Sequence, residues 1–223
     1  MALILNIETS ATNCSVSIGN NGKLLSLKEY NSPEYSHSEN LHVFIREALQ
    51  QASLSFNDLD AIAVSRGPGS YTGLRIGIST AKGLCFVLEK PLIAVDTLQA
   101  MAFSIAIDKG VLAPMLDARR MEVYSAVFNL KGEQLREIQA EIIDETSFIN
   151  FLNQGPVHFF GPGAGKCKDV ITHPNAVFVI DERLPSSKYM IALSEDRFSK
   201  KLFEDVAYFE PFYLKDFVGT KSL

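Results

Sequence analysis

Residues 65–96 constrain the fold of this chain more than any other segment, because they predict one long helix between two strands. A sharp turn at Gly67-Pro68-Gly69 follows the first strand, and Ser70 is suited to cap the first turn of the helix. Pro91 cannot continue a helix, so we expect the helix to end just before it. The predicted helix is about five turns long.

Small residues recur along this helix at Gly73, Gly77 and Ala81, with a spacing of four. Residues four apart lie on the same face of a helix, so these three form one small stripe. Each interior glycine costs about 1 kcal/mol relative to alanine. A helix that keeps two of them therefore indicates close approach by another element.

The helix is also apolar around its whole circumference, since Arg75 and Lys82 are the only charged residues between positions 73 and 88. A helix that is apolar on every side is expected to be buried on every side. Two interpretations are open at this point. The chain's own domain could enclose the helix, or another protein could cover its second side.

The rest of the chain shows the same order of predicted elements twice. Three strands, a helix, a strand and a helix are predicted for residues 1–107, and a similar order follows for residues 108–223. This predicts an α/β protein of two similar subdomains, the first of which carries the long helix. It also allows the C-terminal segment to pack back on the first subdomain. Such an order is typical of the actin/Hsp70/sugar-kinase (RNase H-like) ATPase nucleotide-binding-domain superfamily.

Composition argues against several classes of protein. The net charge of -5 argues against a protein that binds nucleic acid by itself, because such binding needs a basic patch. The three cysteines are widely separated and are expected to be reduced thiols of a cytoplasmic protein, not a disulfide framework or a zinc site. The first residues predict a strand and not a signal peptide, and no segment is long enough to span a bilayer.

Two polar clusters are candidates for a cleft between the subdomains. Glu8, Thr9 and Ser10 follow the first strand, where actin-like ATPases and kinases carry a glycine-containing phosphate loop. Ser10 replaces that glycine, so phosphoryl transfer is not favoured, and these side chains could instead only cap a turn. Asp117 and Arg119 lie in a second predicted turn, where they could form an ion pair, recognise an anion or a partner, or remain solvated.

No motif predicts a cofactor or a metal. Residues 161–166 approach the phosphate-binding loop of ATPases, but only three residues separate Gly161 from Gly165 where that motif needs four. A strand-to-helix turn is the better interpretation. His37 and His42 are five residues apart, which places their side chains about 140° apart around a helix, a poor geometry for a shared metal.

Several runs of residues together resemble one protein family. They are ILNIETSATNCSVSI, SRGPGSYTGLRIGISTAKGL, PLIAVDTLQAMA, PMLDARRMEVYSAVF and EPFYLKDF, and they span nearly the full length of the chain. The chain is similar to the bacterial TsaB family, also called YeaZ, and the GPGSYTGLR block is the most specific part. Members of this family are actin-like, glycoprotease-like (Gcp-like, peptidase M22-type) pseudo-enzymes.

The resemblance implies a non-catalytic subunit of the machinery that makes N6-threonylcarbamoyladenosine beside the anticodon of tRNA. It implies pairing with a TsaD-like catalytic subunit, recruitment of a TsaE-like ATPase, a homodimer when the chain is alone, and contact with tRNA only through the complex. The helical His-x-x-x-His motif with which the catalytic relative binds metal is absent from this sequence. We therefore expect no cofactor. The alternatives are an actin-like small-molecule kinase or ATPase and, less favoured, a glycoprotease-like peptidase.

The family pairs through helices of its N-terminal domain, so the resemblance also implies an interface on the long helix and on the helix before it. The implied interface residues are Tyr71, Gly73, Leu74, Arg75, Gly77, Ile78, Ala81 and Lys82, together with Leu41 and Ile45. A partner there would supply the second side of burial, and the small stripe would allow helix axes to approach to about 8 Å.

Overall fold

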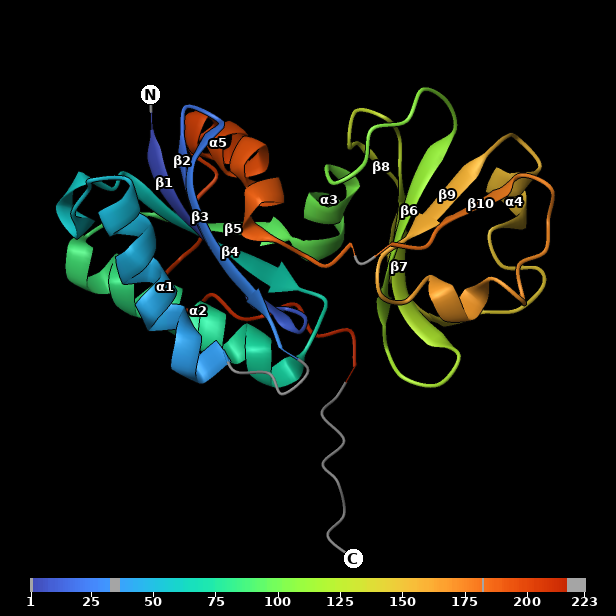
Figure 1. Cartoon of the computed structure of the whole chain (residues 1–223), viewed down its shortest axis with the longest axis horizontal. Coiled ribbons are helices and arrows are strands. Elements are labelled where there is room, and N and C mark those ends of the chain that lie inside the picture. The colour runs from blue at the N-terminus through green and yellow to red at the C-terminus, as the bar shows by residue number, and fades with distance from the viewer. Residues whose placement is uncertain (1, 33–36, 182, 216–223) are drawn as a thin grey trace, which may run out of the picture.

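Two five-stranded sheets form the framework of the computed structural model, which describes residues 2–32, 37–181 and 183–215 (Figure 1). The strand order of the first sheet is β3-β2-β1-β4-β5, with β1 antiparallel to β2 and parallel to β4. Its strands are β1 (Leu3–Glu8), β2 (Asn13–Asn20), β3 (Lys23–Asn31), β4 (Ala61–Gly67) and β5 (Leu92–Asp96).

The second sheet repeats this topology. Its order is β10-β9-β6-β7-β8, with β6 antiparallel to β7 and parallel to β9. Its strands are β6 (Val111–Asp117), β7 (Glu122–Phe128), β8 (Gln134–Ile142), β9 (Val157–Phe160) and β10 (Ala176–Val179). The two α/β halves that the order of elements predicted are therefore confirmed.

Helices cover both faces of the first sheet. α1 (His37–Gln51) and α2 (Tyr71–Leu88) pack on one face, and α5 (Ile191–Ser199) packs on the other. α3 (Thr97–Ala102) contacts strands of both sheets and lies between them (Figure 1). The remaining helical elements are α4 (Ile149–Leu152) and the 3₁₀ turns η1 (Phe56–Asp58), η2 (Gly165–Cys167) and η3 (Ser187–Met190). Within the described ranges, no helix is both long and apolar enough to cross a membrane.

The continuous apolar strands of the first sheet follow from this double covering. Along β1, Leu5 and Ile7 belong to the core beneath α1 and α2, whereas Ile4 belongs to a second core beneath α5. On β4, Val64 lies in the first core and Ala63 in the second. Because successive side chains of a strand point to opposite faces, a strand covered on both sides is expected to be mostly apolar, and in β1 only Asn6 and Glu8 are polar.

The C-terminal part of the chain returns to the first sheet. α5 contacts β1, β2 and β5, and Glu204 forms an antiparallel bridge with Leu92 of β5. Residues 204–215, which we call the C-terminal strap, then run past α2 to β4, where the Phe212 amide donates to the Arg66 carbonyl oxygen at 2.7 Å. The division of the chain into domains at residues 107 and 108 stays a prediction.

The sequence pattern also predicts helices over residues 97–107, 145–152, 164–171 and 186–203, and all four are shorter in the structure. The helix predicted for residues 97–107 ends at Ala102, because Ile105 and Ile107 leave it to pack against a core of the second sheet. The helix predicted for residues 145–152 begins only at Ile149, since Phe148 takes a left-handed conformation with φ of 63°. The helix predicted for residues 186–203 is divided into η3 and α5, and that for residues 164–171 is reduced to η2.

Candidate functional site

The first turn of α2 is anchored to the turn between β1 and β2. The Ser70 hydroxyl accepts a hydrogen bond from the Gly73 amide at 3.3 Å, as expected for an N-cap. The Ser70 amide donates to the Ser10 carbonyl oxygen at 2.7 Å, and the Thr9 hydroxyl donates to the Gly73 carbonyl oxygen at 2.8 Å. The glycine turn therefore places the helix directly against the end of β1.

The small stripe of α2 faces this β1–β2 turn. A Cβ atom added at Gly73 would lie closer than 3.0 Å to the Thr9 carbonyl oxygen, and one at Gly77 would lie equally close to the Thr9 hydroxyl oxygen. Real Cβ atoms do not approach other atoms so closely, so glycine alone fits both positions without a shift. The pattern correctly indicated close packing, and the element that packs there is the chain's own turn.

Most of the residues that the resemblance implied as interface are buried inside the chain itself. Leu41, Ile45, Leu74, Ile78 and Ala81 expose at most 4% of their surface, and Gly73 and Gly77 are buried as well. Four of these apolar side chains, those of Leu41, Ile45, Ile78 and Ala81, belong to the core beneath α1 and α2. In the isolated chain these residues support the helix from within, and their contact with a partner stays a prediction.

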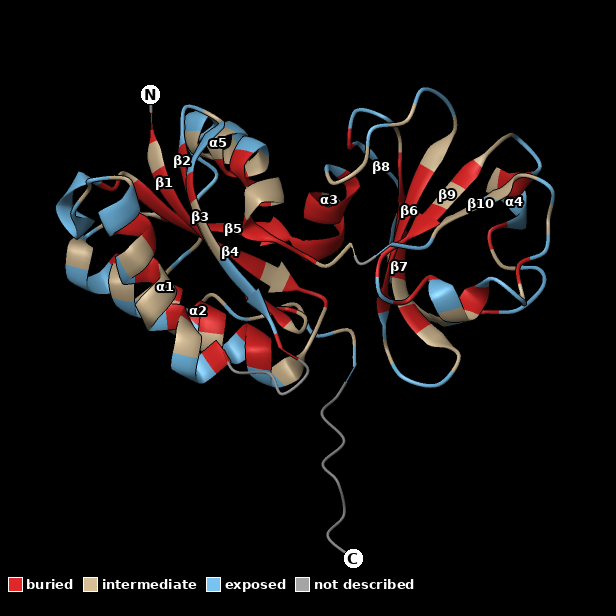
Figure 2. Ribbon diagram, viewed as in Figure 1, coloured by how far each residue is buried: buried red, intermediate tan, exposed pale blue. Residues whose placement is uncertain are grey.

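The opposite side of α2 is exposed. We call the surface formed by Thr72, Arg75, Ser79, Gly83, Phe86 and Val87 the outer face of α2. Phe86 and Val87 are 80% and 77% exposed, although both are large and apolar. Figure 2 shows buried and exposed residues side by side along α2. The chain therefore buries the helix on one side only, which excludes the interpretation that its own domain encloses all of it.

Tyr71 lies at one edge of the outer face and is held in place by its neighbours. The Arg75 guanidinium donates to the Tyr71 hydroxyl at 3.2 Å and lies 5.3 Å from the centre of the Tyr71 ring. The ring of Tyr213 in the C-terminal strap lies 4.9 Å from the Tyr71 ring, with an angle of 31° between the ring planes. The two predicted interface residues Tyr71 and Arg75 thus form one cluster with the strap.

Lys82 lies at the same edge and is bound by the chain itself. Its ammonium group donates to the carbonyl oxygens of Ala207 and Phe209 at 3.1 and 3.0 Å. Lys82 therefore fastens the C-terminal strap to α2. No sequence pattern predicted this contact, because Lys82 and Phe209 are 127 residues apart.

Glu8, Thr9 and Ser10, the first candidate cleft residues, are buried at the end of β1. The Glu8 carboxyl group accepts hydrogen bonds from the Ser10 amide at 2.7 Å and from the Ser65 hydroxyl at 2.8 Å. Burial raises the pKa of Glu8, although these hydrogen bonds oppose the shift. Since Glu8 binds the amide of its own turn and α2 covers that turn, the geometry favours a capped turn over a phosphate loop.

Asp117 and Arg119 lie in an exposed turn between β6 and β7. The Asp117 carboxylate accepts a hydrogen bond from the Arg119 amide at 2.7 Å and pairs with the Lys166 ammonium group at 2.5 Å. Lys166 also donates to the Glu122 carbonyl oxygen at 2.7 Å. These contacts lie within the second half of the chain, whereas those of Glu8 lie within the first. None of these hydrogen bonds and ion pairs therefore connects the Glu8 cluster with the Asp117 cluster.

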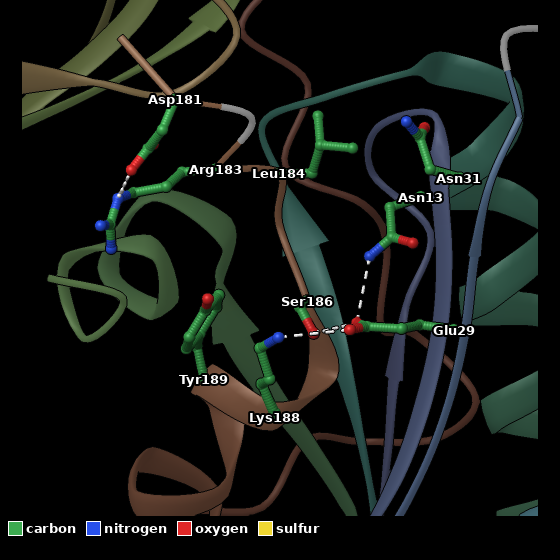
Figure 3. A pocket seen from close by; sticks show the side chains of 9 residues that line it. All are labelled: Asn13, Glu29, Asn31, Asp181, Arg183, Leu184, Ser186, Lys188 and Tyr189. Carbon is green, nitrogen blue, oxygen red and sulfur yellow. Dashed lines mark hydrogen bonds and ion pairs between the residues drawn. The ribbon is translucent and has the colours of Figure 1, made fainter. Parts of the chain in front are cut away.

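A polar cavity of about 490 Å³ lies beside the end of β3 and the segment that leads into η3 (Figure 3). Side-chain amides and charges of both signs line this cavity. The lining residues are Asn13, Glu29, Asn31, Asp181, Arg183, Leu184, Ser186, Lys188 and Tyr189.

Glu29 joins the walls of this cavity. Its carboxylate accepts hydrogen bonds from the Ser186 hydroxyl at 2.5 Å and the Asn13 amide at 3.3 Å, and it pairs with Lys188 at 3.2 Å. Burial alone would raise the pKa of Glu29, but Ser186, Lys188 and Asn13 together hold it below its ordinary value. Sequence reasoning missed this cluster because Glu29 and Ser186 are 157 residues apart and belong to no motif. The cluster ties the returning C-terminal segment to the first sheet.

The histidine pair does not form a metal site in the described part of the chain. His37 is buried and its Nε2 atom bonds the Ala11 carbonyl oxygen at 2.7 Å, while burial lowers its pKa. Across the described ranges, no group of three or more His, Cys, Asp or Glu side chains could hold a metal ion.

Comparison with known proteins gives consistent matches. The model of the family described as TsaD, tRNA N6-adenosine threonylcarbamoyltransferase, matches residues 32–217. The tRNA threonylcarbamoyladenosine biosynthesis protein TsaB of Haemophilus influenzae is 33% identical over 99% of this chain and 96% of its own length.

Solved structures agree with the sequence matches. YeaZ from Pseudomonas aeruginosa superposes with a TM-score of 0.83 at 27% identity, covering 96% of this chain and all of the other. The ethanolamine utilization protein EutJ from Carboxydothermus hydrogenoformans shares the fold with a TM-score of 0.51 at 12% identity, over 86% of this chain and 89% of that one. The expected actin-like fold is confirmed.

Proposed function

The chain belongs to the TsaB family of tRNA threonylcarbamoyladenosine biosynthesis proteins, and on that basis we propose that it is the non-catalytic scaffold subunit of a threonylcarbamoyladenosine-synthesising complex. In this proposal it pairs with a TsaD-like catalytic subunit in the cytoplasm, and a TsaE-like ATPase joins the pair. Contact with tRNA then occurs only through the complex. Alone, the chain forms a homodimer through the surface of α2 that also binds the TsaD-like subunit.

The observation that carries this proposal is the outer face of α2. Phe86 and Val87 leave large apolar surfaces in solvent near one end of α2, and Arg75 is exposed on the same face about three helical turns away. Exposed apolar surface flanked by polar groups is typical of a protein-binding site, and tyrosine and arginine are enriched among the residues that contribute most to such interfaces. We propose that a partner covers this face, with Tyr71 and Arg75 at its edge.

The two enzyme alternatives have less support. A kinase or ATPase would need room for phosphate at the β1–β2 turn, where the Ser10 amide already binds Glu8 and the Thr9 hydroxyl packs against Gly77. A peptidase would need an activated nucleophile or a metal. The three cysteines are buried, and burial raises the pKa of each thiol to about 11 or 12, which opposes thiolate formation.

Light scattering tests the proposal directly. We would measure the mass of the purified chain alone, of the TsaD-like protein from the same source, and of their mixture. We expect a homodimer that exchanges into a one-to-one complex, and we expect Arg75→Glu to weaken that complex at least tenfold by charge reversal at an exposed site. The variant should keep the unfolding free energy within about 0.5 kcal/mol. A chain that is monomeric alone and forms no complex with the TsaD-like protein would contradict the proposal.

A further inference from the structure

The C-terminal strap, which is remote in sequence from α2, lies against the predicted docking residues. We propose that Tyr213 of the strap is a positioning residue for the docking face, because its ring fixes Tyr71 and, through Tyr71, Arg75. This inference rests on the proposed function, since it assumes that the partner binds at the edge formed by Tyr71 and Arg75. It adds a second segment of the chain to that surface.

Several contacts hold the C-terminal strap in place, so it can fix the position of Tyr71. Lys82 holds the carbonyl oxygens of Ala207 and Phe209, and the side chains of Val206 and Phe209 pack against the core beneath α1 and α2. Residues 206–209 of the strap are thus joined to the body of the first half by two kinds of interaction, charge-assisted hydrogen bonds and a partly buried apolar contact.

The segment next to Tyr213 is fixed by β4. The Phe212 amide donates to the Arg66 carbonyl oxygen at 2.7 Å, and the Arg66 guanidinium lies 5.7 Å from the centre of the Phe212 ring. A Cβ atom at Gly67, which has φ of 116°, would lie 2.8 Å from the Phe212 carbonyl oxygen. Gly67 therefore serves both the sharp turn before α2 and the close approach of the strap. Beyond Tyr213, the Lys215 ammonium group pairs with Glu122 of β7 in the second half.

The contacts of Phe212 and Lys215 place the Tyr213 ring against the Tyr71 ring. The two ring centres are 4.9 Å apart, within the range of favourable aromatic pairs. The Arg75 guanidinium contacts the same Tyr71 ring and its hydroxyl. Tyr71 is therefore held between a residue of the strap and a residue of its own helix. Fixing side chains before association reduces the conformational entropy lost on binding, so a preorganised Tyr71 and Arg75 bind more tightly.

Tyr213→Ala and Tyr213→Phe test this role against each other. Alanine removes the ring that supports Tyr71, whereas phenylalanine keeps the ring and removes only the hydroxyl. We expect Tyr213→Ala to raise the Kd for the TsaD-like protein about three- to tenfold, and Tyr213→Phe to restore the Kd of the natural chain to within twofold. Calorimetric titration measures both, and thermal unfolding checks that both variants are folded.

Arg75→Glu separates failure of this inference from failure of the proposed function. If Arg75→Glu weakens the complex but Tyr213→Ala does not, the docking face stands and the positioning role of Tyr213 is wrong. If Tyr213→Phe weakens binding as much as Tyr213→Ala, the ring is not the supporting group and the inference is again wrong. If none of the three changes the Kd, the partner does not bind at this edge, and both proposals fail.

Discussion

The Thr9 hydroxyl donates a buried hydrogen bond of 2.8 Å to the Gly73 carbonyl oxygen, and this bond ties the β1–β2 turn to the first turn of α2. One helical turn further along, the same hydroxyl oxygen occupies the space that a side chain at Gly77 would fill. A single threonine thus accounts for two glycines in the helix. The small stripe is part of the fold of the first half, and the proposed docking face lies on the other side of α2.

Gly77→Ala is expected to destabilise the protein, because overpacking a tight site usually costs about 1–3 kcal/mol. The added Cβ would lie closer than 3.0 Å to the Thr9 hydroxyl oxygen, which is held by its bond to Gly73. This cost should exceed the gain of about 1 kcal/mol that alanine brings through its higher helix propensity. Urea unfolding at one fixed protein concentration measures the difference.

Gly83→Ala is the matched control, because a Cβ at Gly83 on the same helix would meet no atom within 4 Å. We expect it to stabilise the protein by about 0.5–1 kcal/mol through helix propensity alone. In the Thr9→Ala background the penalty of Gly77→Ala should shrink, since the clashing oxygen is absent. Equal effects of the two glycine substitutions would show that Gly77 is not tightly packed.

The order of the elements could be predicted because each depends on a local pattern. The first strand and the glycine turn before α2 depend on patterns of a few residues and are found where they were expected. The Asn20-Asn21-Gly22 sequence, a strong local signal for a hairpin, likewise joins β2 to β3. The helix ends were predicted less well. The left-handed Phe148, for example, shortens α4 although no residue in the predicted helix forbids an earlier start.

Which side of α2 is buried and which is exposed could not be predicted from the sequence. Apolar residues surround the helix, so its pattern does not distinguish the side that Thr9 covers from the side that carries Phe86. That distinction depends on a contact between residues 64 positions apart. The role of Lys82 as a clamp depends on an even longer separation, as do the polar contacts of Glu29, and such pairs leave no periodic signal.

Glu8→Gln is expected to gain stability relative to the natural chain as the pH rises above about 4.5, the ordinary pKa of glutamic acid. Burial raises the pKa of Glu8 in the folded state. Above pH 4.5 the unfolded chain has released this proton while the folded chain still retains it, so rising pH favours unfolding of the natural chain. Glutamine has no such proton. Unfolding free energies of both proteins from pH 4 to pH 8 measure the trend, and a difference that stays constant would contradict it.

The three thiols are expected to react slowly in the folded protein. Burial raises the pKa of Cys14 and Cys85 to about 12 and that of Cys167 to about 11. At pH 8 the reactive thiolate fraction is then roughly 0.1% or less, and the surrounding core excludes the reagent. Labelling with a thiol reagent should therefore be slow in buffer and rapid in denaturant. A thiol that reacts in the folded chain at the rate of a free cysteine would be inconsistent with this burial.

Phe86→Ser is expected to weaken association without loss of stability. Phe86 is 80% exposed, so serine removes little burial from the folded chain, and a surface change of this kind usually alters the unfolding free energy by no more than about 0.5 kcal/mol. If the proposed partner covers the outer face of α2, the same change removes an aromatic side chain from a buried interface, where truncation often costs 2 kcal/mol or more, or about a thirtyfold increase in Kd. Ile142→Ser is the matched control, because Ile142 is 73% exposed on β8 in the second half and is not part of the outer face of α2. Titration against the TsaD-like protein should separate the two variants. Equal binding by both would place the partner elsewhere on the molecule and leave the exposed apolar residues of α2 without a role in the complex.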